Sequence, residues 1–338
     1  MRRNYTAIPR YVPHAVSGYA LNQNESQFEL PERLQRAIQL VTLRSLSRYP
    51  VDELTALKTS YATYAGVQPD QLMVGSGSDE LLAILCQAIL DTEDVVLAPA
   101  PDFSMYGIYA HIARGQFFQP EADGLTIDSL LRLIEANEPK LVLVSNPNNP
   151  TGKMWTLDQL EMIAKQVPYL VVDEAYIDFT MSDSFKSRLA DYPNVIILRT
   201  LSKAFGLANL RIGFMIAHPD LIEKIDRFRS PFNVSGLSAA VATVVLDDPD
   251  YIAQSVAFHN GQRQKLERLL APIGNVWPSR ANFLYVETPD SELWAERFLA
   301  YGVHVRAFPT GLRVSAGTDE AYRFIKQMLE EVTSFENS

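Results

Sequence analysis

Lys203 and Arg211 have the residue types and the spacing to act on one ligand. Lys203 stands in Thr200-Leu201-Ser202-Lys203, directly after an apolar run at 195–198, and Arg211 precedes a second apolar run at 212–217. An amine in a loop of small residues at a strand end is accessible, and a neighbouring guanidinium favours its neutral, nucleophilic form. The pair predicts an amine that attacks a carbonyl carbon. The alternative is a solvated surface lysine, as most loop lysines are.

A second segment with chemical potential is Gly75-Ser76-Gly77-Ser78-Asp79-Glu80, which links a strand candidate to a helix candidate. Backbone N–H groups, glycines and a serine hydroxyl at a helix N-terminus form a site suited to a phosphate. The alternative is an ordinary helix cap by Ser78. The segment lacks the Gly-Lys-Ser/Thr of a Walker loop, and Glu80 stands where a dinucleotide-binding fingerprint has its third glycine.

Two further strand ends carry polar side chains. The loop at 145–152 holds three asparagines and two prolines, and the asparagine amides can donate and accept hydrogen bonds. Asp173 follows the apolar run at 170–172. A carboxylate buried at the end of such a strand needs a cationic partner, although a helix cap or an exposed strand end would also explain it.

One ligand, pyridoxal phosphate, satisfies all four strand ends. Its phosphate needs a cradle of donors, its pyridine nitrogen is held protonated by a carboxylate, and its 3-hydroxyl takes a hydrogen bond. Its aldehyde forms a Schiff base with a lysine. We therefore expect these four segments to converge around pyridoxal phosphate.

The elements that must position these residues alternate along the middle of the chain. Helix-like stretches separate apolar runs of strand length, which lie at 72–74, 95–98, 141–144, 170–172, 195–198 and 212–217. Runs that are apolar on both faces are typical of a mostly parallel sheet covered by helices, with ligands beyond the carboxyl ends of the strands. The pattern predicts an α/β fold with a three-layer large domain at 45–245. Residues 1–44 and 246–338 are expected to form a smaller α+β domain.

Composition excludes several function classes. The 338 residues fit two domains, and a net charge of -10 without a basic cluster argues against a nucleic-acid partner. No segment approaches the roughly 20 apolar residues of a membrane span, and no signal-peptide core is present, so we expect a cytoplasmic protein. The five histidines are scattered and Cys86 is the single cysteine, which argues against a metal site.

The ordered set of motifs resembles the fold-type I pyridoxal-phosphate-dependent aminotransferases, and within them the histidinol-phosphate aminotransferase group. The similarity covers nearly the whole chain, and the set is specific although each motif alone is weak. The motifs are L-N-Q-N-E at 21–25, R-Y-P at 48–50, G-S-G-S-D-E at 75–80, N-N-P-T-G at 148–152, D-E-A-Y at 173–176, T-L-S-K-A-F-G-L-A at 200–208, R-I-G at 211–213, A-N-F at 281–283 and G-L-R-V-S-A-G-T at 311–318.

The resemblance implies roles for the catalytic residues. Lys203 would bind the cofactor through a Schiff base and then act as the general base that moves the substrate proton. Asp173 would pair with the pyridinium nitrogen. Asn149 and Tyr176 would contact the 3-oxygen of the ring.

Further cofactor contacts are implied in the same way. The ring of Phe103 would stack on the pyridine face, where tyrosine is common in the family, so a hydroxyl is lost here. Tyr49 would reach the phosphate of a neighbouring subunit's cofactor, which implies at least a homodimer with a shared active site. The groups implied to hold the phosphate belong to Gly77, Ser78, Asp79, Ser202 and Arg211.

Substrate recognition is implied for residues near both ends of the chain. Arg313 would bind the acidic group of the substrate and Arg306 would assist with a phosphate, because a guanidinium binds such groups bidentately. Asn22, together with Glu25, resembles a strip that closes over the site, and Tyr19 would line the pocket. The loop at 307–312 is shorter than is usual in the group, which leaves the identity of the amine open.

The implied activity is transfer of an amino group between histidinol phosphate, or an aromatic amino acid, and a 2-oxo acid such as 2-oxoglutarate. Histidine biosynthesis is the pathway that the group's name indicates. A threonine-phosphate decarboxylase resembles the same motifs and would break the bond between Cα and the carboxylate instead. An aromatic amino acid aminotransferase and a noncatalytic cofactor-binding protein are the remaining alternatives.

Overall fold

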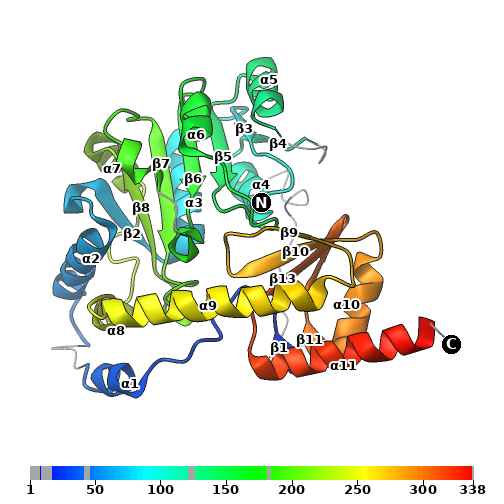
Figure 1. Ribbon diagram of the computed structural model, residues 1–338. Helices are drawn as coiled ribbons and strands as arrows, with labels where there is room; N and C mark the ends of the chain where they lie inside the picture. The colour runs from blue at the N-terminus through cyan, green and yellow to red at the C-terminus, as the bar shows by residue number, and fades with distance from the viewer. Residues whose placement is uncertain (1–7, 9–16, 42–45, 121–125, 181–183, 337–338) are drawn as a thin grey trace.

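A seven-stranded sheet forms the centre of the larger part of the molecule (Figure 1). The computed structural model describes residues 8, 17–41, 46–120, 126–180 and 184–336. Only β8 runs in the direction opposite to the other strands of the sheet, which confirms the prediction of an α/β fold with a mostly parallel central sheet. The spatial order is β2 (Leu72–Gly75), β8 (Gly213–Ala217), β7 (Val195–Thr200), β6 (Tyr169–Asp173), β5 (Leu141–Ser145), β3 (Val95–Leu97) and β4 (Gln116–Phe118).

Helices cover both faces of this sheet because alternate strand residues are apolar on both sides. Every residue of β5, β7 and β8 is buried. Leu143 and Ile196 face one helical layer, which consists of α3 (Gly77–Ile89), α4 (Met105–Ile112) and α7 (Pro219–Asp226). Val144 and Ile197 face the other, which consists of α2 (Val51–Ala65), α5 (Ile127–Asn137), α6 (Leu157–Ala164) and α8 (Gly236–Leu246).

A smaller sheet follows toward the C-terminus. Its strand order is β12 (Arg306–Phe308), β13 (Gly311–Ser315), β10 (Phe283–Glu287) and β9 (Asn275–Trp277). The strands of the hairpin β12–β13 are joined at Pro309 and Thr310, which pairs Arg306 with Arg313. The short strands β1 (Tyr19–Ala20) and β11 (Val303–His304) pair beside this sheet.

Three helices accompany the small sheet, and one of them also reaches the large sheet. They are α9 (Pro249–Leu270), α10 (Ser291–Ala300) and α11 (Asp319–Glu336). Tyr251 at the start of α9 belongs to the large core, and Leu266 near its end belongs to the small one, so α9 runs beneath both (Figure 1). Among the helices that the structure describes, none combines the length and apolarity needed to cross a membrane.

The N-terminal segment contacts both parts. Leu21 packs in the core of the small sheet, whereas Leu34 of α1 (Glu32–Gln39) packs in the core beside α2 and α8. Helix α1 therefore lies against the part of the chain that we assigned to the large domain. We retain the domain division at 45 and 245 as a proposal. The remaining short helices are η2 (Pro69–Gln71), η3 (Ile177–Phe179), η4 (Phe185–Arg188) and η5 (Ala208–Leu210).

Candidate active site

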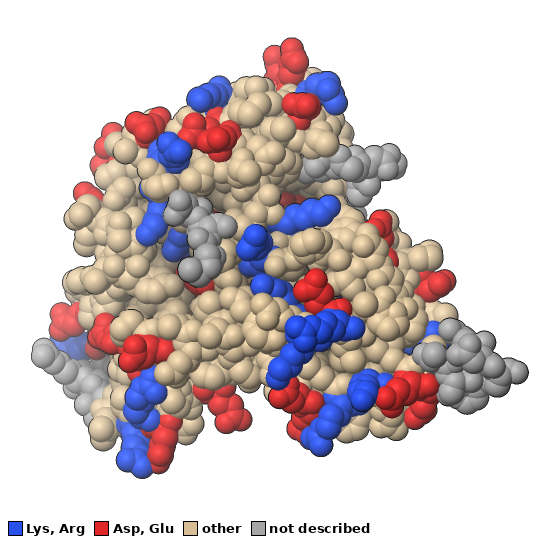
Figure 2. All heavy atoms as spheres, viewed as in Figure 1, with Lys and Arg blue, Asp and Glu red and all other residues tan. Residues whose placement is uncertain are grey.

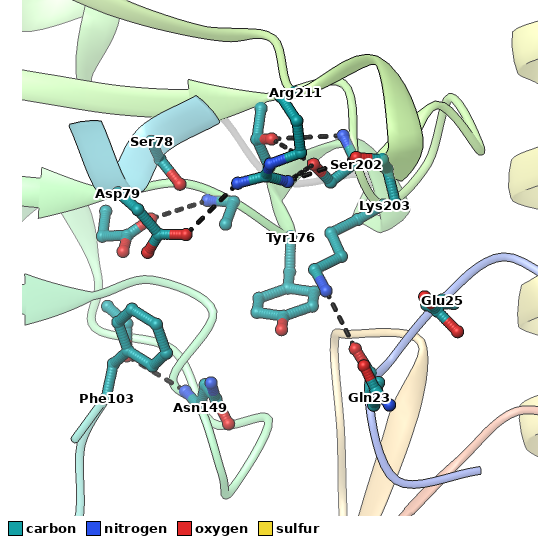
Figure 3. A pocket seen from close by; sticks show the side chains of 15 residues that line it. Gln23, Glu25, Ser78, Asp79, Phe103, Asn149, Tyr176, Ser202, Lys203 and Arg211 are labelled. Carbon is teal, nitrogen blue, oxygen red and sulfur yellow. Dashed lines mark hydrogen bonds and ion pairs between the residues drawn. The ribbon is translucent and has the colours of Figure 1, made fainter. Parts of the chain in front are cut away.

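A cleft opens at the carboxyl ends of β5, β6 and β7, where the N-terminal strip at 21–28 crosses the large part of the molecule. Basic side chains gather near the centre of the face in Figure 2, between the two parts of the molecule. The close view in Figure 3 shows side chains from the four predicted strand ends directed into one space. The predicted cofactor residues that line it are Ser78, Asp79, Phe103, Asn149, Asp173, Tyr176, Ser202, Lys203 and Arg211.

The turn before α3 presents backbone donors to this cleft. Helix α3 begins at Gly77, and its N-cap is Ser76, so the alternative in which Ser78 caps the helix is wrong. In the described part of the chain, the amides of Gly77, Ser78 and Asp79 donate to no protein acceptor. Three such amides at a helix N-terminus are suited to a phosphate.

Two glycines make this turn possible. Gly77 has a φ of 81°, and a Cβ there would lie 2.5 Å from Nη2 of Arg211. A Cβ at Gly213 would lie 2.5 Å from the backbone nitrogen of Ser78. The start of β8 and the start of α3 therefore approach each other closely only because both side chains are absent.

Arg211 lies across the turn with its guanidinium held at several points. Its Nη2 lies 3.3 Å from a carboxylate oxygen of Asp79, and its Nη1 lies 3.2 Å from the carbonyl of Ala208 and 3.5 Å from Oγ of Ser202. Ser202 and Arg211 thus place a hydroxyl and a cation beside the amides of the turn. This combination fits the phosphate group that the sequence predicts.

The amine of Lys203 points into the same cleft. Its Nζ donates to the carbonyl of Gln23 at 3.0 Å and lies 5.9 Å from the centre of the Tyr176 ring. Gln23 and Glu25 line the cleft from the N-terminal strip. Lys203 therefore points into the cleft, where its amine meets the N-terminal strip at Gln23, as Figure 3 shows.

Asp173 is a buried carboxylate whose protein partners are neutral. Tyr106 donates its hydroxyl to Oδ2 at 3.0 Å, and the amide of Ala175 donates to Oδ1 at 3.1 Å. Burial raises the pKa of Asp173 to about 6, against the lowering effect of these two donors. Among the described residues Asp173 has no ion-pair partner, so a cationic ring nitrogen in the cleft fits it.

Sequence reasoning missed a second buried carboxylate behind the cleft. Asp102 accepts hydrogen bonds from the amide of Phe103 at 2.7 Å and from both the amide and the hydroxyl of Ser145. Burial raises the pKa of Asp102 to about 8. Tyr106 was missed as well, because its spacing from Phe103 indicates a helix turn and gives no sign that its hydroxyl reaches β6.

The N-terminal strip reaches the cleft through Asn24, which sequence reasoning also missed. Its Nδ2 donates to the hydroxyl of Tyr176 at 2.8 Å, and its Oδ1 accepts from Ser315 at 2.8 Å. Asn24 is buried and has a φ of 56°. The sequence L-N-Q-N-E marked the strip, but only the fold shows that this asparagine contacts Tyr176.

The predicted substrate residues divide into two groups. Arg313 is buried beside the cleft, where its Nη1 donates to Oδ1 of Asn149 and its Nη2 donates to the carbonyl of Asn22 at 2.6 Å. Arg306 does not line the cleft, and its guanidinium carbon lies 5.4 Å from the ring centre of Phe308. The register of the hairpin nevertheless places Arg306 and Arg313 side by side on one face of the small sheet.

Two predicted residues lie away from the cleft of their own chain. Tyr19 was expected to line the pocket, but its ring packs 5.3 Å from that of Phe324 because β1 lies beside β11 and α11. Tyr49 is 75% exposed and stacks on Phe232 with 4.4 Å between ring centres.

The residues present therefore fit pyridoxal phosphate on observations of the structure itself. Within the described residues, the amides of 77–79 have no protein acceptor and could hold the phosphate, and Asp173 has no ion-pair partner and could pair with the ring nitrogen. The amine of Lys203 could reach the aldehyde, and the ring of Phe103 borders the same space. Each group comes from a different strand end of one sheet.

Comparison with known proteins agrees with this geometry. The family model of aminotransferase class I and II matches residues 17–325. The histidinol-phosphate aminotransferase of Thermoanaerobacter sp. (strain X514) is 34% identical over 98% of both chains, and that of Clostridium novyi (strain NT) is 34% identical over 89% of this chain and 87% of the other. The crystal structure of histidinol-phosphate aminotransferase from Sinorhizobium meliloti in complex with pyridoxal-5'-phosphate is 25% identical, with a TM-score of 0.84 over 93% of this chain and 91% of that one. The chain therefore belongs to the class I and II aminotransferases, in the histidinol-phosphate aminotransferase group.

Proposed function

We propose that this protein is a pyridoxal-phosphate-dependent transaminase that moves an amino group between histidinol phosphate and 2-oxoglutarate. The convergence of Lys203, Asp173 and the amides of 77–79 in one cleft is the observation that carries the proposal. Membership of the histidinol-phosphate aminotransferase group supports the choice of substrate. The proposal includes a step in histidine biosynthesis and the cytoplasm as the place of the reaction.

Pyridoxal phosphate, when bound, supplies an electron-withdrawing ring that lowers the barrier to removal of the substrate's α proton. The residues of the chain do the rest. Lys203 Nζ would hold the cofactor, and its neutral amine would take up and return the substrate's α proton. Asp173 would hold a proton on the ring nitrogen, and Tyr176, whose hydroxyl accepts a hydrogen bond from Asn24 at 2.8 Å, would contact the ring oxygen. The N-terminal strip, whose Gln23 carbonyl accepts a hydrogen bond from Lys203, would limit the access of water to this side of the cleft.

For the substrate, we propose that Arg313 binds the acidic group and that Arg306 assists with the phosphate. Arg313 is held between Asn149 of the large part and Asn22 of the strip, so a bound anion would draw these segments together. Cross-strand pairing sets Arg306 beside Arg313, and Phe308 lies within 6 Å of both guanidinium groups. Two guanidinium groups side by side suit a doubly charged phosphate better than a single carboxylate.

The substrate is tested by measuring kcat/KM with a panel of amino donors and 2-oxoglutarate. We expect histidinol phosphate to exceed phenylalanine and tyrosine by roughly tenfold or more, because the carboxylate of these amino acids can keep the contact with Arg313 but lacks the phosphate that Arg306 would bind. Higher rates with the aromatic amino acids would assign the enzyme to aromatic transamination. Release of carbon dioxide from threonine phosphate without a requirement for the oxo acid would assign it to the decarboxylases.

We also propose a homodimer in which Tyr49 reaches the cofactor site of the partner. In its own chain Tyr49 lies outside the cleft, on a surface with other exposed apolar side chains. These are Leu46, Val51, Phe232 and Leu237, exposed by 88%, 58%, 42% and 54%. A contiguous apolar surface of this kind is typical of a protein interface.

Mixing of inactive subunits tests the shared site. Lys203→Ala lacks the amine and Tyr49→Ala lacks the contributed ring, so each homodimer should be impaired. A mixed dimer holds one complete site, made of Lys203 from one chain and Tyr49 from the other. Recovery of activity on mixing, toward one quarter to one half of the native value, would support the proposal. A sum of the two separate activities would contradict it.

A further inference from the structure

Glu80 occupies the place of a glycine in a dinucleotide fingerprint, and the proposed chemistry gives it no role. It lies in the first turn of α3 and is not among the residues that line the cleft. Its Oε2 accepts two hydrogen bonds, from the amide of Ser76 at 2.5 Å and from Nδ2 of Asn233 at 2.6 Å. The carboxylate thus joins the turn before α3 to a segment more than 150 residues away in the chain.

The bond to Ser76 separates the donors of the turn into two sets. A helix N-terminus has several amides without intrahelical acceptors, and a nearby carboxylate can compete with a ligand for them. Glu80 takes the amide of Ser76, and the amides of Gly77, Ser78 and Asp79 are left for an anion. A carboxylate held in this way fixes the backbone of the turn at its N-terminal side.

Asn233 is itself held from the opposite side. Nη1 of Arg229 donates to its Oδ1 at 3.1 Å, and Arg229 pairs with Asp226 at 2.6 Å. Its neighbour Phe232 has a φ of 57°, a left-handed conformation that a non-glycine residue rarely adopts, and the Phe232 ring stacks on Tyr49. Asn233 is therefore a fixed point against which Glu80 holds the turn.

We propose that Glu80 and Asn233 are positioning residues that hold the turn at 76–79 in the geometry that binds the phosphate of the cofactor. The inference rests on the proposed function, because it concerns how that site grips its anion. Glu80 acts through its two hydrogen bonds and not through its charge, since a negative charge near the turn opposes an anion.

The test compares cofactor binding with and without the phosphate. The dissociation constants of pyridoxal phosphate and of pyridoxal are measured for the apoprotein, and their ratio reports the contribution of the phosphate. We expect Glu80→Ala and Asn233→Ala each to lower this ratio about tenfold, the effect of losing one or two well-made hydrogen bonds. Glu80→Gln keeps an oxygen that accepts both bonds, and it should retain the native ratio within about twofold.

The matched control is Glu223→Ala, which removes an equal charge from a residue paired with Arg227 on the exposed face of α7. It should leave the ratio unchanged. The double variant Glu80→Ala/Asn233→Ala should be no worse than either single variant, because both belong to one link. Asn233→Ala keeps the test decisive if Glu80→Ala fails to fold.

Three results would overturn the inference. One is equal weakening of pyridoxal and pyridoxal phosphate, which indicates a general structural role. The others are a Glu80→Gln variant as impaired as Glu80→Ala, and independent effects of the two sites in the double variant. Failure of the native protein to prefer pyridoxal phosphate to pyridoxal would instead contradict the proposed function, so the two failures are distinguishable.

Discussion

Asp173 and Glu174 are adjacent carboxylates at the end of β6. Their side chains face opposite sides of the sheet and have different hydrogen-bond and ion-pair partners. Asp173 faces the cleft, where a tyrosine hydroxyl and one amide are its protein donors. Glu174 faces the helical layer that contains α2, where Nη2 of Arg199 lies at 2.8 Å, Oγ of Ser184 at 2.7 Å and the amide of Phe185 at 2.9 Å. Both side chains are at least 96% buried.

The difference separates a functional from a structural charge. A buried carboxylate with a cation and two further donors is matched inside the protein, and it holds elements together. A buried carboxylate with neutral partners keeps a raised pKa and can respond to a ligand. On the cleft side, Lys203 and Arg211 likewise have part of their hydrogen-bonding capacity directed at the cleft. Variants on the two sides should therefore lose different properties.

The largest effect is expected for Lys203→Ala on the cleft side. Removal of the amine should abolish turnover and also the covalent cofactor adduct that borohydride traps in the native protein, since no other amine is proposed to bind the aldehyde. Thermal stability of the apoprotein should change little, because Lys203 is not fully buried and its one hydrogen bond to the described residues goes to a carbonyl. Mass spectrometry of the reduced protein measures the adduct.

Lys224→Ala, on the exposed surface of α7, is the matched control and should retain both adduct and turnover. A trapped adduct of native yield in Lys203→Ala would show that another lysine is the attachment point. Lys203 would then no longer count among the cleft residues that act on the cofactor.

Asp173→Asn should lower kcat by roughly 10³-fold, because the ring nitrogen loses the charge that keeps it protonated. Stability should not fall. Burial raises the pKa of Asp173 from 3.8 to about 6, so the native state of the apoprotein loses stability as pH rises from 3.8 to 6 and stays lower above it. The asparagine lacks this penalty, and at pH 8 chemical denaturation should show equal or higher stability. A near-native kcat would contradict the pairing with the ring.

Glu174→Gln should show the opposite pattern. It leaves the buried guanidinium of Arg199 without its nearest carboxylate, so the free energy of unfolding should fall by about 3 kcal/mol. The apolar double variant Glu174→Leu/Arg199→Met removes both charges and should recover much of that loss. Glu223→Ala, at an exposed pair, should stay within about 0.5 kcal/mol of the native value. If Glu174→Gln is as mild as this control, the structural reading of Glu174 is wrong.

The sequence could predict features that have a local pattern, and it could not predict those that depend on how distant segments pack. The residues after the strands of the large sheet were predictable, since runs that are apolar on both faces mark buried strands and ligands lie beyond their carboxyl ends. The antiparallel direction of β8 was not, because the apolar run at 212–217 would look the same in either direction. Figure 1 shows the large sheet and the small part brought together, which no local pattern predicts.

Side-chain pairs between distant segments were beyond sequence reasoning as well. Asn24 meets Tyr176 across 152 positions, and Glu80 meets Asn233 across 153. Each of these residues is ordinary in its local context, and only the packing of the two segments gives it a partner. The position of the Tyr19 ring beside Phe324 was likewise not predictable, because a two-residue strand leaves little local signal of the side on which its ring lies.

The smallest predicted effect is that of removing the Tyr106 hydroxyl, which should change the pKa of Asp173 while leaving the carboxyl group in place. Burial raises the pKa of Asp173 and the bond from Tyr106 lowers it, so Tyr106→Phe should move that pKa above its native value of about 6. Since the ionised form binds the cofactor ring, binding to the apoprotein should weaken as pH falls through this pKa. The acid limb of a plot of affinity against pH should therefore move up by roughly one unit in Tyr106→Phe, the value of one hydrogen bond to a charged group. Affinity at pH 8 should change little.

Tyr109→Phe on the same helix is the control, and Asp173→Asn should lack the limb altogether. Asp102, whose pKa burial raises to about 8, lies behind the same cleft, and Asp102→Asn should leave the acid limb in place. An unmoved limb in Tyr106→Phe would mean that burial alone sets the charge of Asp173.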